Sequence, residues 1–337
     1  MKVVFVKKGF EFEIRDVEIP EIDKNQALVK VKACGLCGTD LHTARIGAKE
    51  FESFGHEVTG IVEAVGENVV EVKIGDSVLL ESGSFCRTCD LCRNGQSDLC
   101  NNAPNIIQNE IMGFSEYIVA PKECLIPFDG MGFDAGTLIE PLGVALDLFY
   151  TTDIKINDDV LVVGLGPIGL MALKLAKVSG ARNIYGVANS WSSARIRAAK
   201  ELGATDIILA DKGQLADYKF PRGGVDKIMS TAPPNTIPDA MKVANIGAII
   251  GFLGIEYGGG ENITFNANDF HFKKLQLRSS FAAPALYFPR CVELIKSGVI
   301  DPALFISHTF KLDRTAEYMI KARDDKATPI KMVMIND

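Results

Sequence analysis

The sequence predicts an α/β protein of two unlike domains, one rich in β-strands and one built on a doubly wound parallel sheet. Three observations lead to this prediction. A length of 337 residues suggests about two domains. Short apolar runs punctuated by glycine and proline fill the first part of the chain, as in a barrel-like or irregular β domain. After about residue 140, apolar strands alternate with helical stretches, which is the pattern of βαβ units.

Three segments of the first part have the pattern of strands. Residues 28–33 alternate in polarity, residues 58–65 form a β-branched run around Gly60, and residues 76–80 follow a turn at Gly75. We therefore expect a strand at each of these three places.

The second part of the chain repeats a strand–helix pattern after a helix expected over 139–150. Strands are expected at 160–163, 183–188, 206–210, 225–229 and 248–253, with helices over 168–178 and 193–202 between the first three. The tail holds a further helix over 288–296 and a strand over 331–335. We place the parallel-sheet domain at 147–282 and the β-rich domain at 1–146 together with 283–337.

Composition narrows the classes of partner. The chain carries 36 Lys and Arg against 43 Asp and Glu, a net charge of −7, so no general attraction to nucleic acid or to an anionic membrane is expected. We find no run of some 18 apolar residues and no signal-peptide core at the N-terminus. These observations predict a cytoplasmic protein without a nucleic-acid or membrane partner.

Four of the eight cysteines crowd into one short segment, as Cys86, Cys89, Cys92 and Cys100. Closely spaced cysteines on a turn-rich loop can supply the four tetrahedral ligands that zinc requires. A site with four thiolates has no open position, so we expect a structural zinc ion. Unligated surface cysteines are the alternative, and exposed free thiols are a liability.

A second set of metal-ligating side chains lies upstream. Cys37, His56 and Glu57 offer a thiol, an imidazole and a carboxylate, and Glu140 adds a second carboxylate farther along the chain. Three protein ligands with water in the fourth position are the pattern of a catalytic zinc site. The spacing Cys34-x-x-Cys37 is also that of a redox pair, which is usually found in a thioredoxin-like βαβ context that this stretch lacks.

A glycine-rich turn follows the strand expected at 160–163. Its residues are Gly164, Gly166, Pro167, Ile168 and Gly169, and a helix begins within them. This is the context that the dinucleotide fingerprint requires: tight turning, close backbone approach to a pyrophosphate, and a positive helix end. An ordinary strand–helix turn is the alternative.

The fingerprint usually continues with an acidic residue about 20 positions on, which binds the adenine ribose 2′-hydroxyl. Ser190 stands there, and no Asp or Glu occurs between Gly169 and Glu201. Asn189, Ser190 and Arg195 offer donors to a 2′-phosphate instead. This pattern favours NADP(H) over NAD(H), unless Arg195 is merely a solvated helix residue.

Taken together, these motifs resemble those of the zinc-containing medium-chain dehydrogenase/reductase superfamily. They occur in the same order as in that family, and the resemblance covers essentially the whole chain. The matching segments are Cys37-Gly-Thr-Asp-Leu-His42, Gly55-His-Glu-Val-Thr-Gly60, the four-cysteine lobe, Glu140-Pro-Leu142, and Gly164-Leu-Gly-Pro-Ile-Gly169. The resemblance implies a GroES-like catalytic domain that holds zinc, a Rossmann-type dinucleotide-binding domain, two zinc ions per chain, and a homo-oligomer (tetramer or dimer).

The resemblance also implies roles for individual residues. Cys37 and His56 would ligate the catalytic zinc, and Glu57 or Glu140 would complete the site. Thr39 would pass the alcohol proton toward a ribose hydroxyl and His42, so that Thr39, His42 and Glu57 are the expected catalytic residues. Asp40 would orient His56, or else cap a loop.

The resemblance is greatest to the polyol (sorbitol-type) and sugar dehydrogenase branch, because of Gly55-His-Glu57 and Glu140-Pro-Leu142. It implies hydride transfer between NADP(H) and the secondary alcohol or ketone of a polyol or sugar, phosphorylated or not. Asp147 departs from this branch, which often has histidine there. The alternatives are a dehydrogenase of threonine-type or simple secondary alcohols, and a zinc- and nucleotide-binding protein without catalysis.

Overall fold

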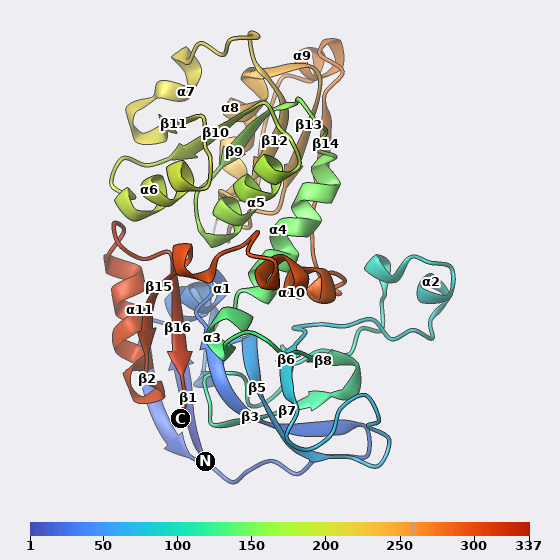
Figure 1. The fold of residues 1–337 in the computed structure, drawn as a ribbon. Coiled ribbons are helices and arrows are strands. Elements are labelled where there is room, and N and C mark those ends of the chain that lie inside the picture. The colour runs from blue at the N-terminus through green and yellow to red at the C-terminus, as the bar shows by residue number, and fades with distance from the viewer. Residues whose placement is uncertain (258) are drawn as a thin grey trace. The chain divides into compact units, whose positions relative to one another are not determined.

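A computed structural model describes residues 1–257 and 259–337, and within it the chain divides into two compact units (Figure 1). Unit 1 comprises Met1–Gly143 and Ala282–Asp337, and unit 2 comprises Val144–Phe281. The first boundary lies three residues before the one predicted, and the second lies one residue before. Both ends of the chain therefore belong to unit 1.

The larger sheet of unit 1 has the strand order β15-β16-β3-β5-β6-β8, with β7 paired to β3. Its strands are β3 (Gln26–Gly35), β5 (Glu57–Val65), β6 (Ser77–Leu80), β7 (Tyr117–Pro121), β8 (Leu125–Pro127), β15 (Ile306–Phe310) and β16 (Lys331–Ile335). The three strands expected in the first part, and the terminal strand, are confirmed. A smaller sheet of β2 (Glu11–Asp16), β1 (Lys2–Lys7) and β4 (Glu52–Ser53) completes the strands of this unit.

Strand pairing brings the end of the chain beside its beginning. Val333 in β16 lies opposite Gly35 in β3, and Gly35 in turn lies opposite Glu57 in β5, both in antiparallel register. The buried side chains of these strands form one core with those of β1, β7 and the C-terminal helix. The start of β5 and the start of β16 therefore pack in the same core.

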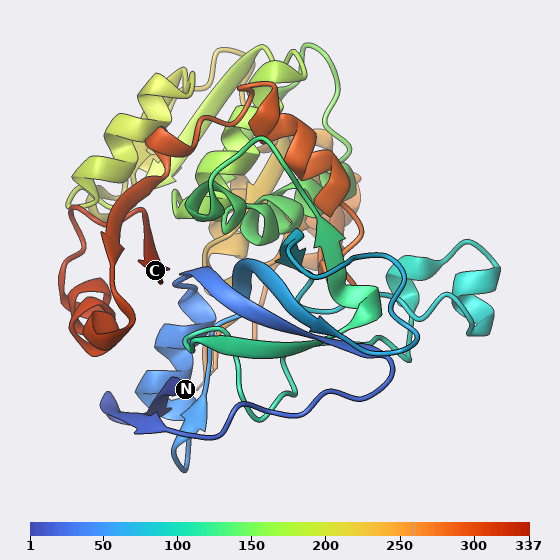
Figure 2. The same cartoon turned by 60° about the horizontal axis from the view of Figure 1, so that its bottom comes forward.

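Short helices and a protruding lobe complete unit 1. The helices are α1 (Gly38–His42), α2 (Asp90–Arg93), α3 (Phe133–Gly136), α10 (Phe288–Lys296) and α11 (Thr315–Asp324). The segment that carries α2 projects from the rest of the unit in both ribbon views (Figures 1 and 2). Helix α4 (Ile139–Thr152) begins in unit 1 and ends in unit 2.

Unit 2 is built on a parallel sheet of six strands in the order β11-β10-β9-β12-β13-β14. Its strands are β9 (Asp159–Val163), β10 (Asn183–Ala188), β11 (Asp206–Leu209), β12 (Val225–Ser230), β13 (Ala244–Phe252) and β14 (Gln276–Ser279). Its helices are α5 (Pro167–Val178), α6 (Ser193–Glu201), α7 (Gln214–Asp217), α8 (Ile237–Lys242) and α9 (Ala267–Phe272). The order is that of the doubly wound dinucleotide-binding fold, with the switch point between β9 and β12.

Every residue of β9 is buried, which requires cover on both faces of the sheet. Leu161 and Val163 pack in one core with Ile237 and Met241 of α8. Since side chains alternate along a strand, Val160 and Val162 face the opposite side, where they are also fully buried. The expected doubly wound arrangement is thus confirmed.

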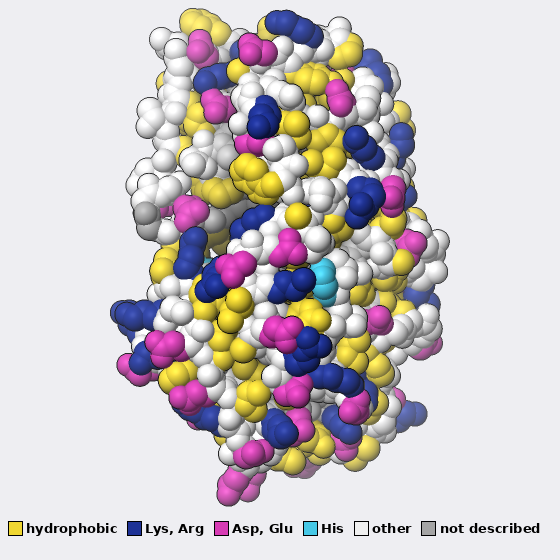
Figure 3. All heavy atoms as spheres, turned by 90° about the vertical axis from the view of Figure 1, so that its left-hand side faces the viewer, with side chains coloured by type: hydrophobic (Ala, Val, Ile, Leu, Met, Phe, Trp, Pro, Cys, Tyr) yellow, Lys and Arg dark blue, Asp and Glu magenta, His cyan; other side chains and the backbone are white. Residues whose placement is uncertain are grey.

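Basic and acidic side chains are interspersed over the face drawn in Figure 3, with hydrophobic side chains between them. Among the described residues, no helix has both the length and the apolar character needed to cross a membrane.

Candidate metal centres and cofactor site

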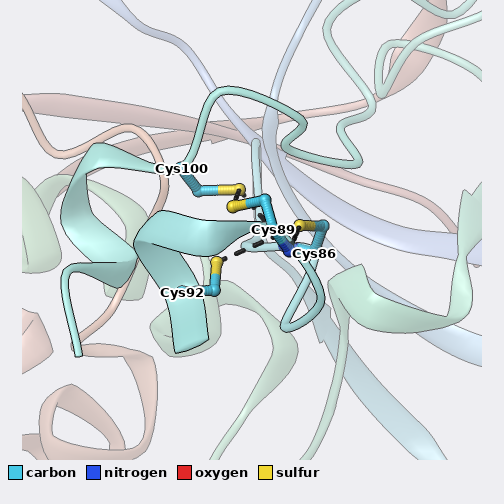
Figure 4. Close-up of side chains that lie close together, drawn as sticks. All are labelled: Cys86, Cys89, Cys92 and Cys100. Carbon is cyan, nitrogen blue, oxygen red and sulfur yellow. Dashed lines mark hydrogen bonds between the residues drawn. The ribbon is translucent and has the colours of Figure 1, made fainter. Parts of the chain in front are cut away.

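The four cysteines of the protruding lobe converge. Cys86 and Cys89 precede α2, Cys92 lies within it, and Cys100 returns after a polar turn. Their four Sγ atoms lie within 4.8 Å of one another. Figure 4 shows these side chains pointing toward a common centre.

The spacing of the sulfur atoms fits a zinc ion. Cys86 and Cys92 Sγ are 4.0 Å apart, and Cys89 and Cys100 Sγ are 3.9 Å apart. Zinc–sulfur bonds of about 2.3 Å place the vertices of a tetrahedron about 3.8 Å apart, whereas a disulfide requires about 2.05 Å. Hydrogen bonds from the Thr88 hydroxyl and backbone, and from the Cys89 N–H, lower the pKa of Cys86 to about 5, whereas burial and the neighbouring Cys89 and Cys100 thiols raise that of Cys92 to about 12. The donor set is therefore suited to a closed zinc site.

A second cluster forms where β3, α1 and β5 meet. The ligand atoms of Cys37, His56 and Glu57 lie within 4.8 Å of one another. Cys37 caps the start of α1, and His56 and Glu57 lie at the start of β5. Gly55 turns the chain with a φ of +97°, and a Cβ there would lie 2.6 Å from a ring carbon of Phe114. Only glycine fits this turn, which aims His56 at Cys37.

Burial and neighbouring charges shift the pKa values of this cluster. Burial alone would lower the pKa of His56, but Cys37, Asp40 and Glu140 raise it well above its ordinary value. Burial raises the pKa of Glu140, and Glu57 raises it further, against the lowering effect of His56. A thiol, an imidazole and buried carboxylates that repel one another fit a divalent ion with mixed sulfur, nitrogen and oxygen ligands.

Glu140 lies outside the three-residue cluster. It occupies the first turn of α4, and the Ser82 hydroxyl donates to its Oε1 at 3.4 Å. Of the two carboxylates expected to complete the site, Glu57 is the one that belongs to the group whose ligand atoms all lie within 4.8 Å of one another.

Lys331 is a residue of this site that the sequence did not indicate. Its Nζ donates to both carboxylate oxygens of Glu57 at 2.6 Å and to the Leu36 carbonyl at 3.1 Å. Both side chains are buried. Burial lowers the pKa of Lys331, but Glu57 and Cys37 raise it above its ordinary value, so that the amine stays charged.

Asp40 caps α1. Its Oδ2 accepts from the Cys37 N–H at 2.8 Å, whereas its Oδ1 lies 3.9 Å from His56 Nδ1, beyond hydrogen-bond distance. Asp40 therefore completes a capping box with Cys37, and its carboxylate also lies close enough to His56 to raise the pKa of the imidazole.

The two residues expected to move the proton are neighbours on α1. Thr39 is exposed, and its Oγ1 lies 3.6 Å from Cys37 Sγ. His42 follows three residues later, so its side chain lies on the same face of the helix. Cys34 is fully buried in the core, and burial raises the pKa of its thiol well above the ordinary value, which disfavours a redox pair with Cys37.

The glycine-rich turn of unit 2 has the geometry that a dinucleotide needs. Gly164 has a φ of +92°, and a Cβ on Gly169 would lie 1.9 Å from the Gly164 carbonyl oxygen. A Cβ on Gly166 would meet nothing within 4 Å, so the backbone is open there. Helix α5 begins immediately after, with Pro167 first and Ile168 second. Each glycine thus fills the role that the fingerprint assigns to it.

The loop after β10 holds the residues expected at the adenosine end. Asn189 and Ser190 follow the strand, and Arg195 lies in the first turn of α6. A carboxylate is nevertheless present at this loop: Asp211 accepts from the Ser190 N–H at 2.6 Å and from its hydroxyl at 2.7 Å. Asp211 comes from beyond β11, outside the segment in which an acidic residue was sought.

Two known protein families match this chain, one mainly in unit 1 and the other mainly in unit 2. Residues 23–130 match the family "Alcohol dehydrogenase GroES-like domain", and residues 167–297 match the family "Zinc-binding dehydrogenase". These matches confirm the predicted combination of a GroES-like and a Rossmann-type domain.

Individual relatives cover nearly the whole chain. L-threonine 3-dehydrogenase of Bacillus subtilis (strain 168) is 34% identical over 93% of this chain and 92% of its own. Sorbitol dehydrogenase of the same strain is 29% identical over 99% and 97%. The crystal structure of a zinc-binding dehydrogenase from Sinorhizobium meliloti 1021 bound to NADP superposes with a TM-score of 0.89 at 27% identity, covering 99% of each chain.

These matches support a zinc-dependent alcohol dehydrogenase with a nicotinamide cofactor. The recognised motifs, the two kinds of domain and the full-length relatives agree, and the chain belongs to the zinc-containing medium-chain dehydrogenase/reductase superfamily.

Proposed function

We propose that this enzyme transfers a hydride between a nicotinamide dinucleotide and the secondary alcohol or ketone of a polyol or sugar. The observation that carries the proposal is the buried cluster of Cys37, His56 and Glu57. Three protein ligands leave a fourth position for substrate or water, whereas the four-cysteine lobe has none. A purely structural or nucleotide-binding protein needs no open site.

The residues of unit 1 have distinct roles in this proposal. A zinc ion held by Cys37, His56 and Glu57 would polarise the substrate oxygen and favour the alkoxide near neutral pH. In the oxidation direction, Thr39 would take up the hydroxyl proton and pass it toward a ribose hydroxyl and His42, and a bound nicotinamide would supply the acceptor for the hydride of the carbinol carbon. Lys331 holds Glu57 in place, and Glu140 adds a buried carboxylate able to accept hydrogen bonds from the further hydroxyls of a polyol.

Unit 2 supplies the cofactor site in the proposal. The open backbone at Gly166 and the first N–H groups of α5, including that of Ile168, would hold the pyrophosphate. Asn189, Ser190 and Arg195 are assigned to the adenosine end. The expected preference for NADP(H) rested on the lack of a carboxylate there, so Asp211 makes the cofactor preference an open choice between the two dinucleotides.

Threonine is the second candidate substrate, because the threonine dehydrogenase from Bacillus subtilis is 34% identical to this chain. The two candidates make different demands. A polyol offers only hydroxyls, which suits a site rich in carboxylates. Threonine brings a carboxylate, which the buried Glu57 and Glu140 would repel, and an ammonium group, which they would attract. A polyol needs no such compensation between charges, and we therefore rank the polyol or sugar first.

The proposal also includes a second zinc ion, a cellular location and an oligomeric state. A second zinc ion is assigned to Cys86, Cys89, Cys92 and Cys100, and a cytoplasmic location is expected. A homo-oligomer, dimer or tetramer, is expected as well. In support of it, β14 stands at the edge of the unit 2 sheet, with the exposed Phe272 and Phe281 before and after it.

A substrate panel tests the proposal. The purified protein is assayed with sorbitol, galactitol, galactitol 1-phosphate, L-threonine and butane-2,3-diol, each with NAD and with NADP. We expect turnover of a polyol or its phosphate, and about two zinc ions per chain by metal analysis. Turnover of threonine alone would establish the second candidate. One zinc ion per chain and no turnover of any substrate would instead indicate a binding protein.

A further inference from the structure

The carboxylate of Asp211 forms a two-point contact with Ser190. The Ser190 N–H donates to Oδ1 at 2.6 Å, and the Ser190 hydroxyl donates to Oδ2 at 2.7 Å. These hydrogen bonds, the side-chain bond first, lower the pKa of Asp211. The group is therefore a negatively charged carboxylate at neutral pH.

Strand register explains why the two residues meet. In the parallel pair β10–β11, Ala188 lies opposite Leu209. Both strands end at these residues, and a further two positions along each lead to Ser190 and Asp211. The carboxylate thus lies at the carboxyl end of the second strand of the unit, although it belongs to the third.

That end of the second strand is where a dinucleotide-binding sheet recognises the adenosine ribose. The pyrophosphate lies at the glycine turn after the first strand, and an acidic side chain after the second accepts from the 2′-hydroxyl. In this chain the first strand is β9, which pairs with β10 in parallel register, with Val163 opposite Val187. The glycine-rich turn after β9 and the pair of Ser190 and Asp211 after β10 and β11 therefore lie at the same end of the sheet, where one dinucleotide would contact both.

We propose that Asp211, held by Ser190, is the residue that recognises the adenosine ribose and makes this chain prefer NAD(H) to NADP(H). The inference rests on the proposed function, since it concerns the same cofactor. Each carboxylate oxygen has a second lone pair with which to accept from a 2′-hydroxyl. A 2′-phosphate at the same place would bring two or more like charges together, which disfavours binding.

Lys212 does not cancel this charge. Its Nζ lies 3.8 Å from Asp211 Oδ2, and its side chain is 61% exposed. The Asp211 side chain is only 14% exposed, but the Lys212 ammonium stays in water, where solvent and salt weaken its attraction to the carboxylate. Arg195 and Asn189 are donors that would favour a 2′-phosphate, whereas Asp211 would disfavour it. The relative affinities for NADH and NADPH show which of these groups has the larger effect.

Trp191 provides a direct readout of binding. It is the only tryptophan of the chain, it follows Ser190, and it is 51% exposed. The experiment titrates NADH and NADPH separately into the full-length protein and follows quenching of Trp191 emission. It needs neither zinc nor turnover, so it can succeed where the proposed activity fails.

We expect the wild type to bind NADH about tenfold or more tightly than NADPH, because like charges lie close together. Asp211→Asn keeps the size and one acceptor, and it should reduce this ratio about tenfold, mainly by tighter NADPH binding. Asp217→Asn, at the exposed last residue of α7, removes the same charge and should leave the ratio unchanged. Lys212→Ala should widen the preference for NADH.

Equal or tighter binding of NADPH by the wild type would overturn the inference and restore the assignment to Arg195 and Asn189. Weaker binding of both cofactors by Asp211→Asn, with the ratio unchanged, would also overturn it, since Asp211 would then only hold the loop. Failure of the wild type to bind either cofactor would overturn the proposed function as well. Binding of NADH without turnover would sustain the inference and contradict only the proposed activity.

Discussion

Lys331 Nζ lies 2.6 Å from each carboxylate oxygen of Glu57, and both side chains are buried. The pair joins the last strand of the chain to the strand that follows His56. It also fixes the carboxylate that lies with Cys37 and His56 in the metal cluster. The position of this proposed metal ligand therefore depends on a residue far away in the sequence.

Removal of the Lys331 amine should destabilise unit 1. Lys331→Met leaves the Glu57 charge buried without its partner, which typically costs about 3–5 kcal/mol. Denaturant unfolding measures the loss, and Glu57→Gln combined with Lys331→Met should recover a large part of it. The control is Lys7→Met, which breaks a partly exposed pair with Glu50 and should cost at most about 1 kcal/mol. Equal free energies of unfolding for Lys331→Met and Lys7→Met would show that the buried pair does not stabilise the fold more than an exposed one.

Gly35 leaves the space in which the Glu57 carboxylate lies. A Cβ at Gly35 would come within 2.0 Å of Glu57 Oε2, an atom that Lys331 holds in place. Gly35→Ala should therefore displace Glu57, at a cost of about 1–3 kcal/mol, and lower zinc retention by the catalytic site. Gly83→Ala is the control, because its Cβ would make only an ordinary 3.6 Å contact with Asn105. Full zinc content in Gly35→Ala would contradict this account of the carboxylate.

The two zinc sites should differ in lability. The four-cysteine site is closed, whereas the cluster at Cys37 must exchange water and substrate. Increasing chelator should abolish activity and remove about one zinc ion per chain before the protein unfolds. Simultaneous loss of activity, both metal ions and fold at every chelator concentration would argue against two sites of different kinds.

Thr39 should carry the proton step. Thr39→Val keeps the shape but removes the hydroxyl, and loss of general acid–base assistance typically costs a factor of about 10² to 10⁴ in rate. Thr39→Ser should retain most of the activity, and zinc content should be unchanged in both variants. Near-normal turnover of the valine variant, measured where hydride transfer limits the rate, would exclude Thr39 from the proton path.

Glu81 should make the stability depend on pH. Burial raises the pKa of this carboxyl group to about 7. The folded protein then holds a proton that the unfolded chain releases between about pH 4.5 and 7, so stability should fall as pH rises through this window.

Glu81→Gln removes that penalty, and it should gain up to about 3 kcal/mol over the wild type above pH 7, with no gain below about pH 4.5. Glu63→Gln, on the exposed face of β5, is the matched control and should not change the pH profile. Parallel pH profiles of stability for the Glu81→Gln variant and the wild type would contradict the raised pKa.

Local patterns in the sequence were sufficient for much of the fold. The strand at 160–163, the glycine turn and the helix after it are encoded within a few residues, because apolar runs, glycines and helix starts act locally. The four-cysteine cluster was predictable for the same reason, since its ligands lie close together in the chain.

Contacts that depend on strand order were not predictable in this way. Lys331 and Glu57 are 274 residues apart, and they meet only because β16 and β5 both pair with β3. Asp211 is 21 residues from Ser190, and their contact follows from the register of β10 and β11, which local periodicity does not fix. At Asp40, both contacts considered from the sequence are present, since its carboxylate caps the start of α1 and lies 3.9 Å from His56 Nδ1.

The most direct test of the central claim follows the hydride itself. The polyol that the substrate panel identifies is labelled with deuterium at its carbinol carbons, and the reduced cofactor is analysed by mass spectrometry. We predict that the wild type transfers one deuterium to the nicotinamide and that Cys37→Ser, which loses a metal ligand, transfers none. Cofactor reduced without deuterium, or labelled equally by the Cys37→Ser variant, would contradict zinc-dependent hydride transfer at this site.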